Sequence, residues 1–201
     1  MTRTGRPRAF DTDQALARAR DLFWSQGYGA TSIQNLVDEL KVQRGSLYAA
    51  FGDKRGLYLQ AVALYAEQNR QRLQALVATD PVLPTIRQML LDPAALTGAA
   101  GLAGGGRRGC LLGNTTAELL PDDTTARELV AAAYHTTVEI LTAALERAQS
   151  AGEVTTDTTP QAQAQLLLLL FQGAALVGRA QPDHDQLAAG IDAAIDALRA
   201  R

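Results

Sequence analysis

The fold is decided by residues 31–54, which read TSIQNLVDELKVQRGSLYAAFGDK. The first two residues of this stretch can cap a short helix over residues 33–40, whose apolar side chains recur at intervals of three and four. Only residues 41–42 separate it from the next polar segment, residues 43–49, which predicts a further short helix. Two short helices joined by so tight a turn predict a helix-turn-helix motif.

The second of these helices carries side chains suited to reading base pairs in the major groove, where such a helix lies in DNA-binding motifs. Arg44 can donate to O6 and N7 of guanine, and Gln43 can pair with N6 and N7 of adenine. Gly45 lets the backbone come close, and Ser46 lies at the same end of the helix. A solvated polar turn between two helices explains the same spacing, so both interpretations stay open from these residues alone.

The flanking residues predict contacts to phosphate. Thr31 and Ser32 offer hydroxyls and backbone N–H groups at a helix start, which is a favourable position for an anion. Tyr48 and Lys54 are predicted to hold the opposite phosphates.

The charge distribution agrees with a nucleic-acid partner at the N-terminal end. The chain of 201 residues has a net charge of −2, yet residues 1–60 hold nine basic and six acidic side chains, a balance of +3, and residues 61–201 hold ten and fifteen, a balance of −5. Arg6 and Arg8, with Gly5 and Pro7, are similar to a minor-groove hook, and a basic tail attracted to any DNA is the alternative.

Helical periodicity covers almost the whole chain and predicts an all-α fold. The expected helices span residues 11–26, 33–40, 43–49, 53–78, 85–91, 110–120, 130–148, 160–179 and 183–199. The Gly-rich stretch 98–109 predicts a loop, and its G-x-G-x-x-G spacing lacks the preceding strand that a dinucleotide site requires.

Compartment and membrane association follow from cysteine content and from the longest apolar run. A lone Cys110 cannot form a disulfide within its chain, so we expect a reducing cytoplasm. The start of the chain has no apolar signal region. The run 166–178 is 13 residues long, too short to span a bilayer, and predicts a buried helix rather than a membrane contact.

The last two predicted helices indicate a dimer. The run 166–171 is apolar around its whole helix and needs more cover than one neighbouring helix can supply, so we predict a four-helix interface with a second copy, although a fully intramolecular core would also explain it. The residues assigned to this interface are Leu168, Phe171, Ala175, Gly178, Ile191, Ile195 and Leu198.

Five polar or reactive residues are candidates for an effector site. They are Cys110, Asn114, Glu118, His135 and Glu139. Arginines beside Cys110 favour a reactive thiolate and thus a redox or electrophile sensor, while burial of an inert thiol is the plainer interpretation. A thiol enzyme with Cys110 as nucleophile and His135 as base is a rival hypothesis. Two histidines in all argue against a dedicated metal site, and no cofactor is expected.

Residues 8–65 are similar to the N-terminal domain of the TetR family of bacterial transcriptional regulators. The matching residues are Ala15, Leu16, Ala19, Phe23, Gly27, Tyr28, Thr31, Ser32, Ile33, Leu36, Val42, Gly45, Ser46, Leu47, Tyr48, Phe51, Lys54, Leu57 and Tyr58. This resemblance implies a homodimer, most often a repressor, that binds a palindromic operator in double-stranded DNA and is released by a small-molecule effector.

The resemblance also implies roles for particular residues and parts of the chain. Base readout falls to residues 43–46, and phosphate contacts fall to Thr31, Ser32, Tyr48 and Lys54. Residues 1–55 would form the arm and the three-helix DNA-binding head. A long fourth helix would join this head to residues 56–201, the domain for effector binding and dimerisation. The identity of the effector does not carry over, and a nonspecific DNA-coating protein is a further alternative.

Overall fold

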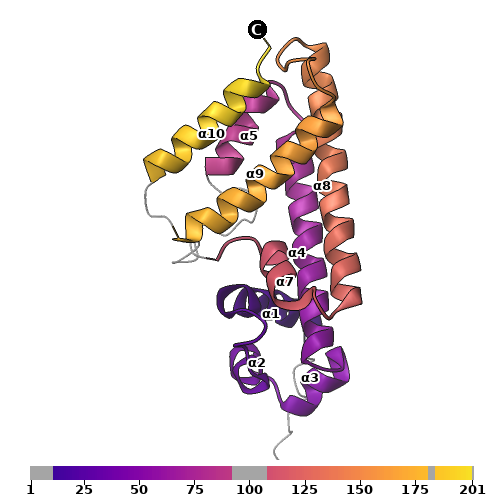
Figure 1. The fold of residues 1–201 in the computed structure, drawn as a ribbon. Coiled ribbons are helices and arrows are strands. Elements are labelled where there is room, and N and C mark those ends of the chain that lie inside the picture. The colour runs from indigo at the N-terminus through magenta and orange to yellow at the C-terminus, as the bar shows by residue number, and fades with distance from the viewer. Residues whose placement is uncertain (1–10, 92–107, 181–183, 201) are drawn as a thin grey trace, which may run out of the picture. The chain divides into compact units, whose positions relative to one another are not determined.

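The computed structural model describes residues 11–91, 108–180 and 184–200, which form helices joined by turns (Figure 1). The helices in these ranges are α1 (Thr12–Gln26), α2 (Ile33–Leu40), α3 (Arg44–Phe51), α4 (Lys54–Leu76), α5 (Val82–Leu91), α7 (Leu111–Leu119), α8 (Thr124–Ser150), α9 (Pro160–Ala180) and α10 (His184–Leu198). The predicted all-α fold is confirmed. The one β-type pairing among the described residues is an isolated antiparallel bridge between Val154 and Arg199.

The chain divides into two compact units, Met1–Leu64 and Tyr65–Arg201, which we describe separately. The division lies within α4, after the boundary at residue 55 that the sequence predicts.

Helix α1 of the N-terminal unit begins and ends at the residues that its sequence predicts. The Asp11 carboxylate accepts hydrogen bonds from the backbone N–H groups of Asp13 (3.1 Å) and Gln14 (3.0 Å), which would otherwise have no partner within the helix. Gly27 ends the helix with a φ of 86°, and its N–H donates to the carbonyl of Phe23 at 2.7 Å.

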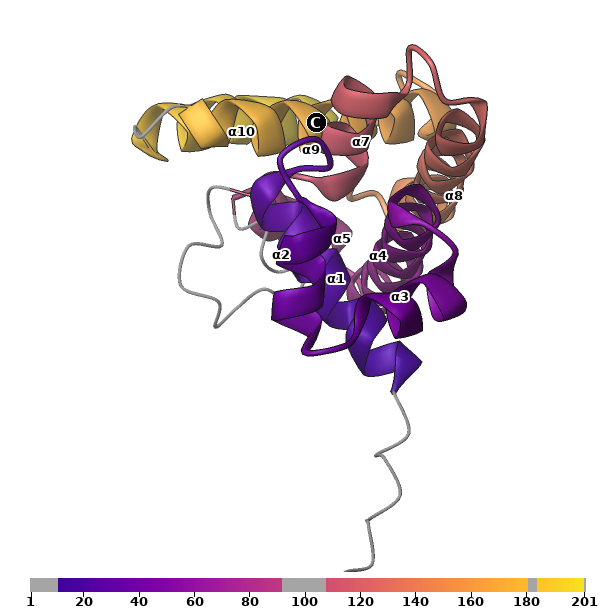
Figure 2. The same ribbon diagram turned by 90° about the horizontal axis from the view of Figure 1, so that it is seen from below.

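Helices α1, α2, α3 and the start of α4 make up the N-terminal unit (Figure 2), and each contributes buried apolar side chains. Phe23 meets Tyr58 edge to face with ring centroids 4.9 Å apart, and Tyr58 meets Tyr28 at 4.8 Å. The other buried apolar side chains of this unit are Ala15, Ala19, Trp24, Leu36, Leu40, Leu47, Phe51, Leu57, Ala61 and Val62. Each large side chain contributes about 1.5–3 kcal/mol by leaving water, so α2 and α3 depend on this core more than on their own length.

The core of the C-terminal unit lies between α5, α8, α9 and α10, and α8 and α9 lie side by side (Figure 1). Its fully buried residues include Leu83 and Ile86 of α5, Leu141 and Leu145 of α8, and Leu167 of α9. Helix α10 closes this core with Ile191, Ile195 and Leu198.

Polar contacts fix the ends of the helices in this unit. The carboxylate of Glu153 accepts hydrogen bonds from the N–H groups of Val82 (2.8 Å) and Leu83 (2.7 Å), so a distant acidic side chain caps the first turn of α5. The guanidinium of Arg87 on α5 donates to both carboxylate oxygens of Asp192 on α10. These bonds hold α5 between the loop after α8 and the last helix.

Replacing Leu47 by alanine should destabilise the N-terminal unit by about 2–5 kcal/mol, because it leaves a cavity under α3. Trp24 is the single tryptophan of the sequence and lies in the core of the same unit, so urea unfolding followed by its fluorescence reports this loss. The control Gln26→Ala, at an exposed position on α1, should change the free energy of unfolding by less than about 0.5 kcal/mol. Equal effects of the two variants would contradict the anchoring role of Leu47.

Candidate nucleic-acid interface and effector cluster

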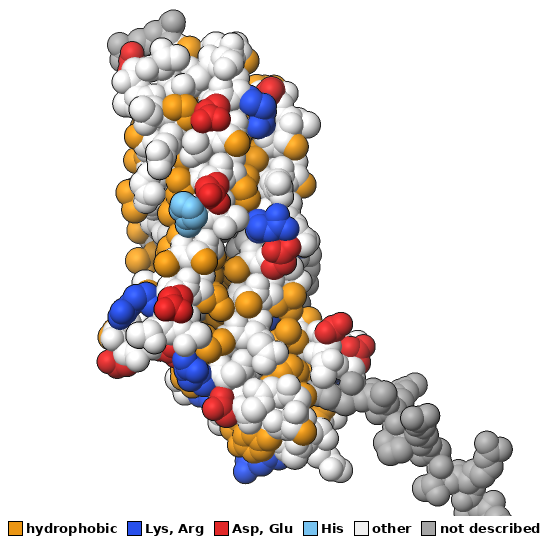
Figure 3. Space-filling model, turned by 90° about the vertical axis from the view of Figure 1, so that its right-hand side faces the viewer, with side chains coloured by type: hydrophobic (Ala, Val, Ile, Leu, Met, Phe, Trp, Pro, Cys, Tyr) orange, Lys and Arg blue, Asp and Glu red, His pale blue; other side chains and the backbone are white. Residues whose placement is uncertain are grey.

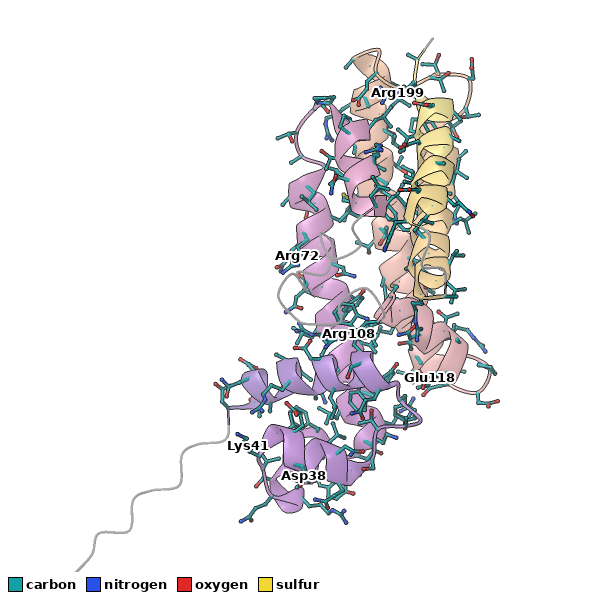
Figure 4. All side chains as sticks on the ribbon, turned by 90° about the vertical axis from the view of Figure 1, so that its left-hand side faces the viewer. Asp38, Lys41, Arg72, Arg108, Glu118 and Arg199 are labelled. Carbon is teal, nitrogen blue, oxygen red and sulfur yellow. The ribbon has the colours of Figure 1, made fainter. Side chains whose placement is uncertain are left out.

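The turn between α2 and α3 is as short as the sequence predicts. Lys41 takes the left-handed conformation with a φ of 55°, and its N–H donates to the carbonyl of Val37. The N–H of Val42 donates to the same carbonyl at 3.3 Å. Asp38 and Lys41, both exposed, are labelled near this turn in Figure 4. The chain therefore turns directly into α3.

Ser32 begins α2 through a capping box. Its hydroxyl accepts from the N–H of Asn35 (3.0 Å), and the Asn35 side chain accepts from the N–H of Ser32 (2.9 Å). Ser32 is exposed, so the N-terminal end of α2 remains open to an anion.

The hydroxyl of Thr31, one of the predicted phosphate contacts, is engaged within the chain. Its side chain is fully buried, and its hydroxyl donates to the carbonyl of Gly27 at 2.7 Å. The hydroxyl of Thr31 thus ties the loop before α2 to the end of α1.

Helix α3 presents a polar end and hides two large apolar side chains. Leu47 is fully buried and Phe51 is 6% exposed. The four residues predicted to read bases, Gln43, Arg44, Gly45 and Ser46, are all exposed. Gln43 occupies the N-cap position without a side-chain capping bond, so its amide is available to a ligand. Among the described residues, Arg44 forms no ion pair.

Two more candidate contacts lie on α3 and at the start of α4. Tyr48 is 40% exposed. The ammonium of Lys54 lies 4.3 Å from the ring centroid of Tyr28, a cation–π contact that orients the side chain. Asp53 caps α4, accepting from the N–H of Gly56 at 2.6 Å, as its position in the sequence predicts.

Gly56 is a structural residue that sequence reasoning missed. A Cβ at this position would lie 2.5 Å from the carbonyl oxygen of Phe51, so only glycine lets α4 begin so close to the end of α3. Arg6 and Arg8, the predicted minor-groove arm, lie outside the described residues.

In the C-terminal unit, Cys110 lies at the N-cap position of α7 and is half-buried. The hydroxyl of Tyr65 on α4 donates toward its sulfur at 3.8 Å, and the side-chain amide of Gln172 on α9 does so at 3.7 Å. Tyr134 on α8 donates to the Gln172 carbonyl oxygen at 3.3 Å. Four helices thus converge on one thiol, and we call Tyr65, Cys110, Tyr134 and Gln172 the thiol cluster.

Burial perturbs the phenols of the thiol cluster. It raises the pKa of Tyr65 well above its usual value, with a further rise from the adjacent Cys110, while a hydrogen bond to Asn69 acts in the opposite direction. Burial also raises the pKa of Tyr134. Both phenols therefore stay protonated near neutral pH and act as hydrogen-bond donors.

Close backbone approach joins the start of α7 to α9. Gly109 has a φ of 65°, and a Cβ there would lie 2.7 Å from Cδ of Arg179. A Cβ at Gly113 would lie 2.9 Å from Oε1 of Gln172. The side chain of Asn114 donates a hydrogen bond to the carbonyl of Arg108 at 3.1 Å and accepts one from Arg179 at 2.9 Å. Arg108 is labelled in Figure 4. The side chain of Asn114, a predicted effector contact, therefore links α7 to the residue before it in the chain, Arg108, and to Arg179 on α9.

The other three candidate effector residues are not part of the thiol cluster. His135 and Glu139 are 75% and 61% exposed and pair with each other at 3.2 Å on the outer face of α8. Glu118 is exposed on α7. On the side of the molecule shown in Figure 3, acidic and basic side chains are interspersed rather than gathered in one patch. Their role in effector binding stays a prediction from the sequence.

This exposure also removes the residue pair that the enzyme hypothesis needs. The Cys110 sulfur accepts hydrogen bonds from Tyr65 and Gln172, and His135 pairs with Glu139 instead. Within residues 11–91, 108–180 and 184–200, no group of three or more His, Cys, Asp or Glu side chains could hold a metal ion.

The predicted interface residues on α9 and α10 also need correction. Ile191, Ile195 and Leu198 lie in the chain's own core, each no more than 4% exposed, and Leu168 is 7% exposed. Phe171 packs against the same core, and Ala175 and Gly178 are half-buried toward α7 and α10. The large apolar side chains that remain exposed on α9 are Leu166, Leu169, Leu176 and Val177.

The chain is similar to known families and proteins along most of its length. Residues 15–61 match the family described as bacterial regulatory proteins, tetR family, and residues 103–198 match the tetracyclin repressor-like C-terminal domain. YezE of Bacillus subtilis, an uncharacterized HTH-type transcriptional regulator, is 30% identical over 96% of this chain and 99% of its own length. ComR of Escherichia coli, an HTH-type transcriptional repressor, is 27% identical over 87% of this chain and 82% of its own length.

Solved structures agree with the sequence relatives. One similar structure is a variant of the TetR family regulator CifR with three cysteine replacements, complexed with 26-bp double-strand operator DNA. It is 26% identical to this chain, with a TM-score of 0.79, and the match covers 96% of this chain and 100% of the CifR chain. The regulatory protein TetR from Rhodobacter sphaeroides is 26% identical with a TM-score of 0.77, covering 92% and 98%. The helix-turn-helix geometry and these matches along nearly the whole chain lead to one conclusion: the chain belongs to the TetR family of bacterial transcriptional regulators and is not an enzyme.

Proposed function

We propose that this regulator binds a palindromic operator as a homodimer, acts as a repressor in the bacterial cytoplasm, and releases DNA when a small-molecule effector binds. The observation that carries the proposal is the exposed polar end of α3, formed by Gln43, Arg44 and Ser46. The buried side chains of Leu47 and Phe51 hold this helix in place. The operator complex of CifR and the repressor name of ComR support it.

The mode of DNA binding divides the contacts into two kinds. Gln43, Arg44 and Ser46 read base edges in the major groove, while Ser32, Tyr48 and Lys54 contact phosphates. Phosphate contacts fix the position of the protein on the duplex, and base contacts supply the specificity. The arm with Arg6 and Arg8 adds a minor-groove contact beside each half-site.

Arg44→Ala should weaken binding to an operator selected from random-sequence duplexes by about 1–3 kcal/mol and relax the preference at one base pair, because a bidentate contact to guanine is lost. Lys54→Ala should weaken binding to all DNA sequences alike. It should also reduce the slope of log affinity against log salt concentration by about one. Titrations against the operator and its single-base variants at several salt concentrations measure both effects. If both variants act uniformly on all sequences, Arg44 does not read a base, and if the wild type fails to prefer any duplex over random DNA, the protein is a nonspecific DNA binder.

A second copy of the chain is the proposed cover for the exposed side of α9. Leu169 and Leu176 are 61% and 68% exposed, an unfavourable state for leucines on a helix in water. Helix α10 exposes small residues, namely Ala189, Gly190, Ala193 and Ala197. Small side chains on one helix let the leucines of another approach closely, so α9 of one copy can pack on α10 of its partner in a four-helix interface.

The same helix, with 21 residues, is long and apolar enough to cross a membrane by length and composition alone. Its inner side, however, carries Ala164 and Leu167 in the core of the unit, and Gln163 is buried with a hydrogen bond to the carbonyl of Thr155. A helix held in this way within its own unit favours a protein partner over lipid.

Leu169→Glu should convert the dimer into a monomer, because a carboxylate would be buried without a partner in the interface. Light scattering coupled to size exclusion should show the mass falling from about twice 21.4 kDa to 21.4 kDa. Ala132→Glu, at an exposed position on α8, is the control and should stay dimeric. A wild-type monomer, or a dimeric Leu169→Glu, would contradict the proposed interface.

The effector is proposed to act through the thiol cluster. The cluster joins α4, α7, α8 and α9. In a dimer, the two recognition helices must lie about 34–36 Å apart to enter successive major grooves. An effector that rearranges these helices would favour a spacing that no longer fits DNA. Its leverage is limited to the difference in its affinity for the two states.

A sensor role for the Cys110 thiol is the second candidate, in which the effector is an electrophile. Two donors aim at the sulfur, and Cys110 occupies the N-cap of α7, so the thiol lies among polar groups. Addition to an electrophile would break the hydrogen bond from Gln172 and separate the start of α7 from α9.

N-Ethylmaleimide should lower operator affinity of the wild type by at least about tenfold, and Cys110→Ser should bind the operator normally and resist the reagent. Mass spectrometry confirms that a single adduct forms, since the sequence has one cysteine. In this addition the thiolate forms one S–C bond, the ring C=C becomes a single bond, and water supplies the proton to the neighbouring carbon. A quantitative adduct with unchanged affinity would exclude the sensor role and leave non-covalent effectors.

A further inference from the structure

The first turn of α4 carries positive charge where a helix prefers negative charge. Helix α4 begins with Lys54 and Arg55, and its first turn holds no acidic residue. Aligned peptide dipoles give the N-terminal end of a helix a partial positive charge, which disfavours cations there. The helix itself therefore gives no reason for a cation at position 54.

An aromatic ring supplies a favourable contact for this cation. The ammonium of Lys54 lies 4.3 Å from the ring centroid of Tyr28, which is within the range of a cation–π interaction. Both side chains are half-buried, so water screens the contact less than it would on an open surface. The contact holds a long, flexible side chain near one position.

The ring of Tyr28 is itself fixed by two buried rings. It meets Tyr58 edge to face with centroids 4.8 Å apart and lies tilted against Phe23 at 6.3 Å. Phe23 and Tyr58 are both fully buried and meet each other edge to face at 4.9 Å. We call Phe23, Tyr28 and Tyr58 the aromatic platform. Because it belongs to the core of the N-terminal unit, the platform gives the ammonium a rigid support.

A supported ammonium is better prepared for an anion than a free one. A lysine ammonium has three N–H donors, and a ring on one side leaves donors for phosphate oxygens on the other. A free lysine side chain loses its rotamer freedom when it binds, and this loss weakens affinity. Support from the platform imposes part of that loss during folding, before DNA arrives.

We propose that Tyr28 is a positioning residue for DNA binding, because its ring holds the ammonium of Lys54 ready for a backbone phosphate. This inference rests on the proposed function, in which Lys54 contacts a phosphate. Tyr28 acts through its ring and not through its hydroxyl, and it raises the affinity for all DNA sequences alike.

The first test detects the contact in the free protein. The sequence has two lysines, Lys41 and Lys54, so lysine labelled with ¹³C gives two sets of side-chain NMR signals, which Lys41→Arg assigns. The ring current of Tyr28 should shift the Hε signal of Lys54 upfield of that of Lys41, which is exposed. Tyr28→Phe should keep this shift and Tyr28→Leu should abolish it. Coincident Hε signals in the wild type would overturn the inference.

The second test separates positioning from folding by a double-mutant cycle. Tyr28→Leu should weaken binding to the selected operator and to random-sequence duplex alike, by about two- to fivefold, the range for a partly exposed cation–π contact. Tyr28→Phe, which keeps the ring, should bind as the wild type does. In the Lys54→Ala background, Tyr28→Leu should cause no further loss. Should Tyr28→Leu fail to fold, Tyr28→Met takes its place, since methionine fills irregular apolar space.

The outcomes distinguish this inference from the proposed function. An equal loss from Tyr28→Leu with and without Lys54 would show that the ring only supports the fold, and a loss in Tyr28→Phe would assign the effect to the hydroxyl. Either result overturns the role of Tyr28 and leaves the regulator as proposed. If Lys54→Ala binds every duplex as tightly as the wild type, the phosphate contact of the proposed function is wrong, and the inference fails with it.

Discussion

The burial of Leu47 and Phe51 under α3 is the constraint on which the proposed DNA-binding surface depends. A helix of eight residues has little stability of its own, so these two side chains must hold it on the core formed by Phe23, Leu36 and Tyr58. The polar residues at the start of α3, Gln43, Arg44 and Ser46, are all exposed. The tight turn at Lys41 and the Cβ-free contact at Gly56 fix the two ends of the helix. A recognition surface therefore results from apolar packing behind it.

The C-terminal unit combines an apolar core with one polar centre. Most of its buried residues are leucine, isoleucine, valine and alanine, whereas the thiol cluster brings two phenols, an amide and a thiol together between four helices. Partly buried polar groups of this kind specify one arrangement of the helices, and a ligand that competes for their hydrogen bonds changes which arrangement is favoured. Close contacts at Gly109 and Gly113 join the start of α7 to α9, which also bears the exposed leucines.

The sequence predicts features that depend on neighbours along the chain. The caps at Asp11, Ser32 and Asp53 and most helix bounds follow from local rules and are confirmed. Features that depend on tertiary packing could not be predicted. Thr31 and Ser32 have the same chemistry, and only the fold shows that the first is buried. Periodicity marks Ile191 and Ile195 as apolar but does not say whether they meet their own chain or a partner. Cys110 contacts Tyr65 and Gln172, which are separated from it by 45 and 62 positions in the sequence. No local sequence pattern predicts contacts at such separations.

The central claim is that two copies of α3, held at a fixed separation, read two half-sites on one side of the duplex. A spacing series tests it most directly: the selected operator is compared with versions in which 5 or 10 base pairs are inserted between the half-sites, and dimer affinity is measured for each. We expect a 5-base-pair insertion, half a helical turn, to reduce binding to the level of a single half-site, because the two grooves then face opposite sides. Equal affinity for the operator and the 5-base-pair insertion would contradict it.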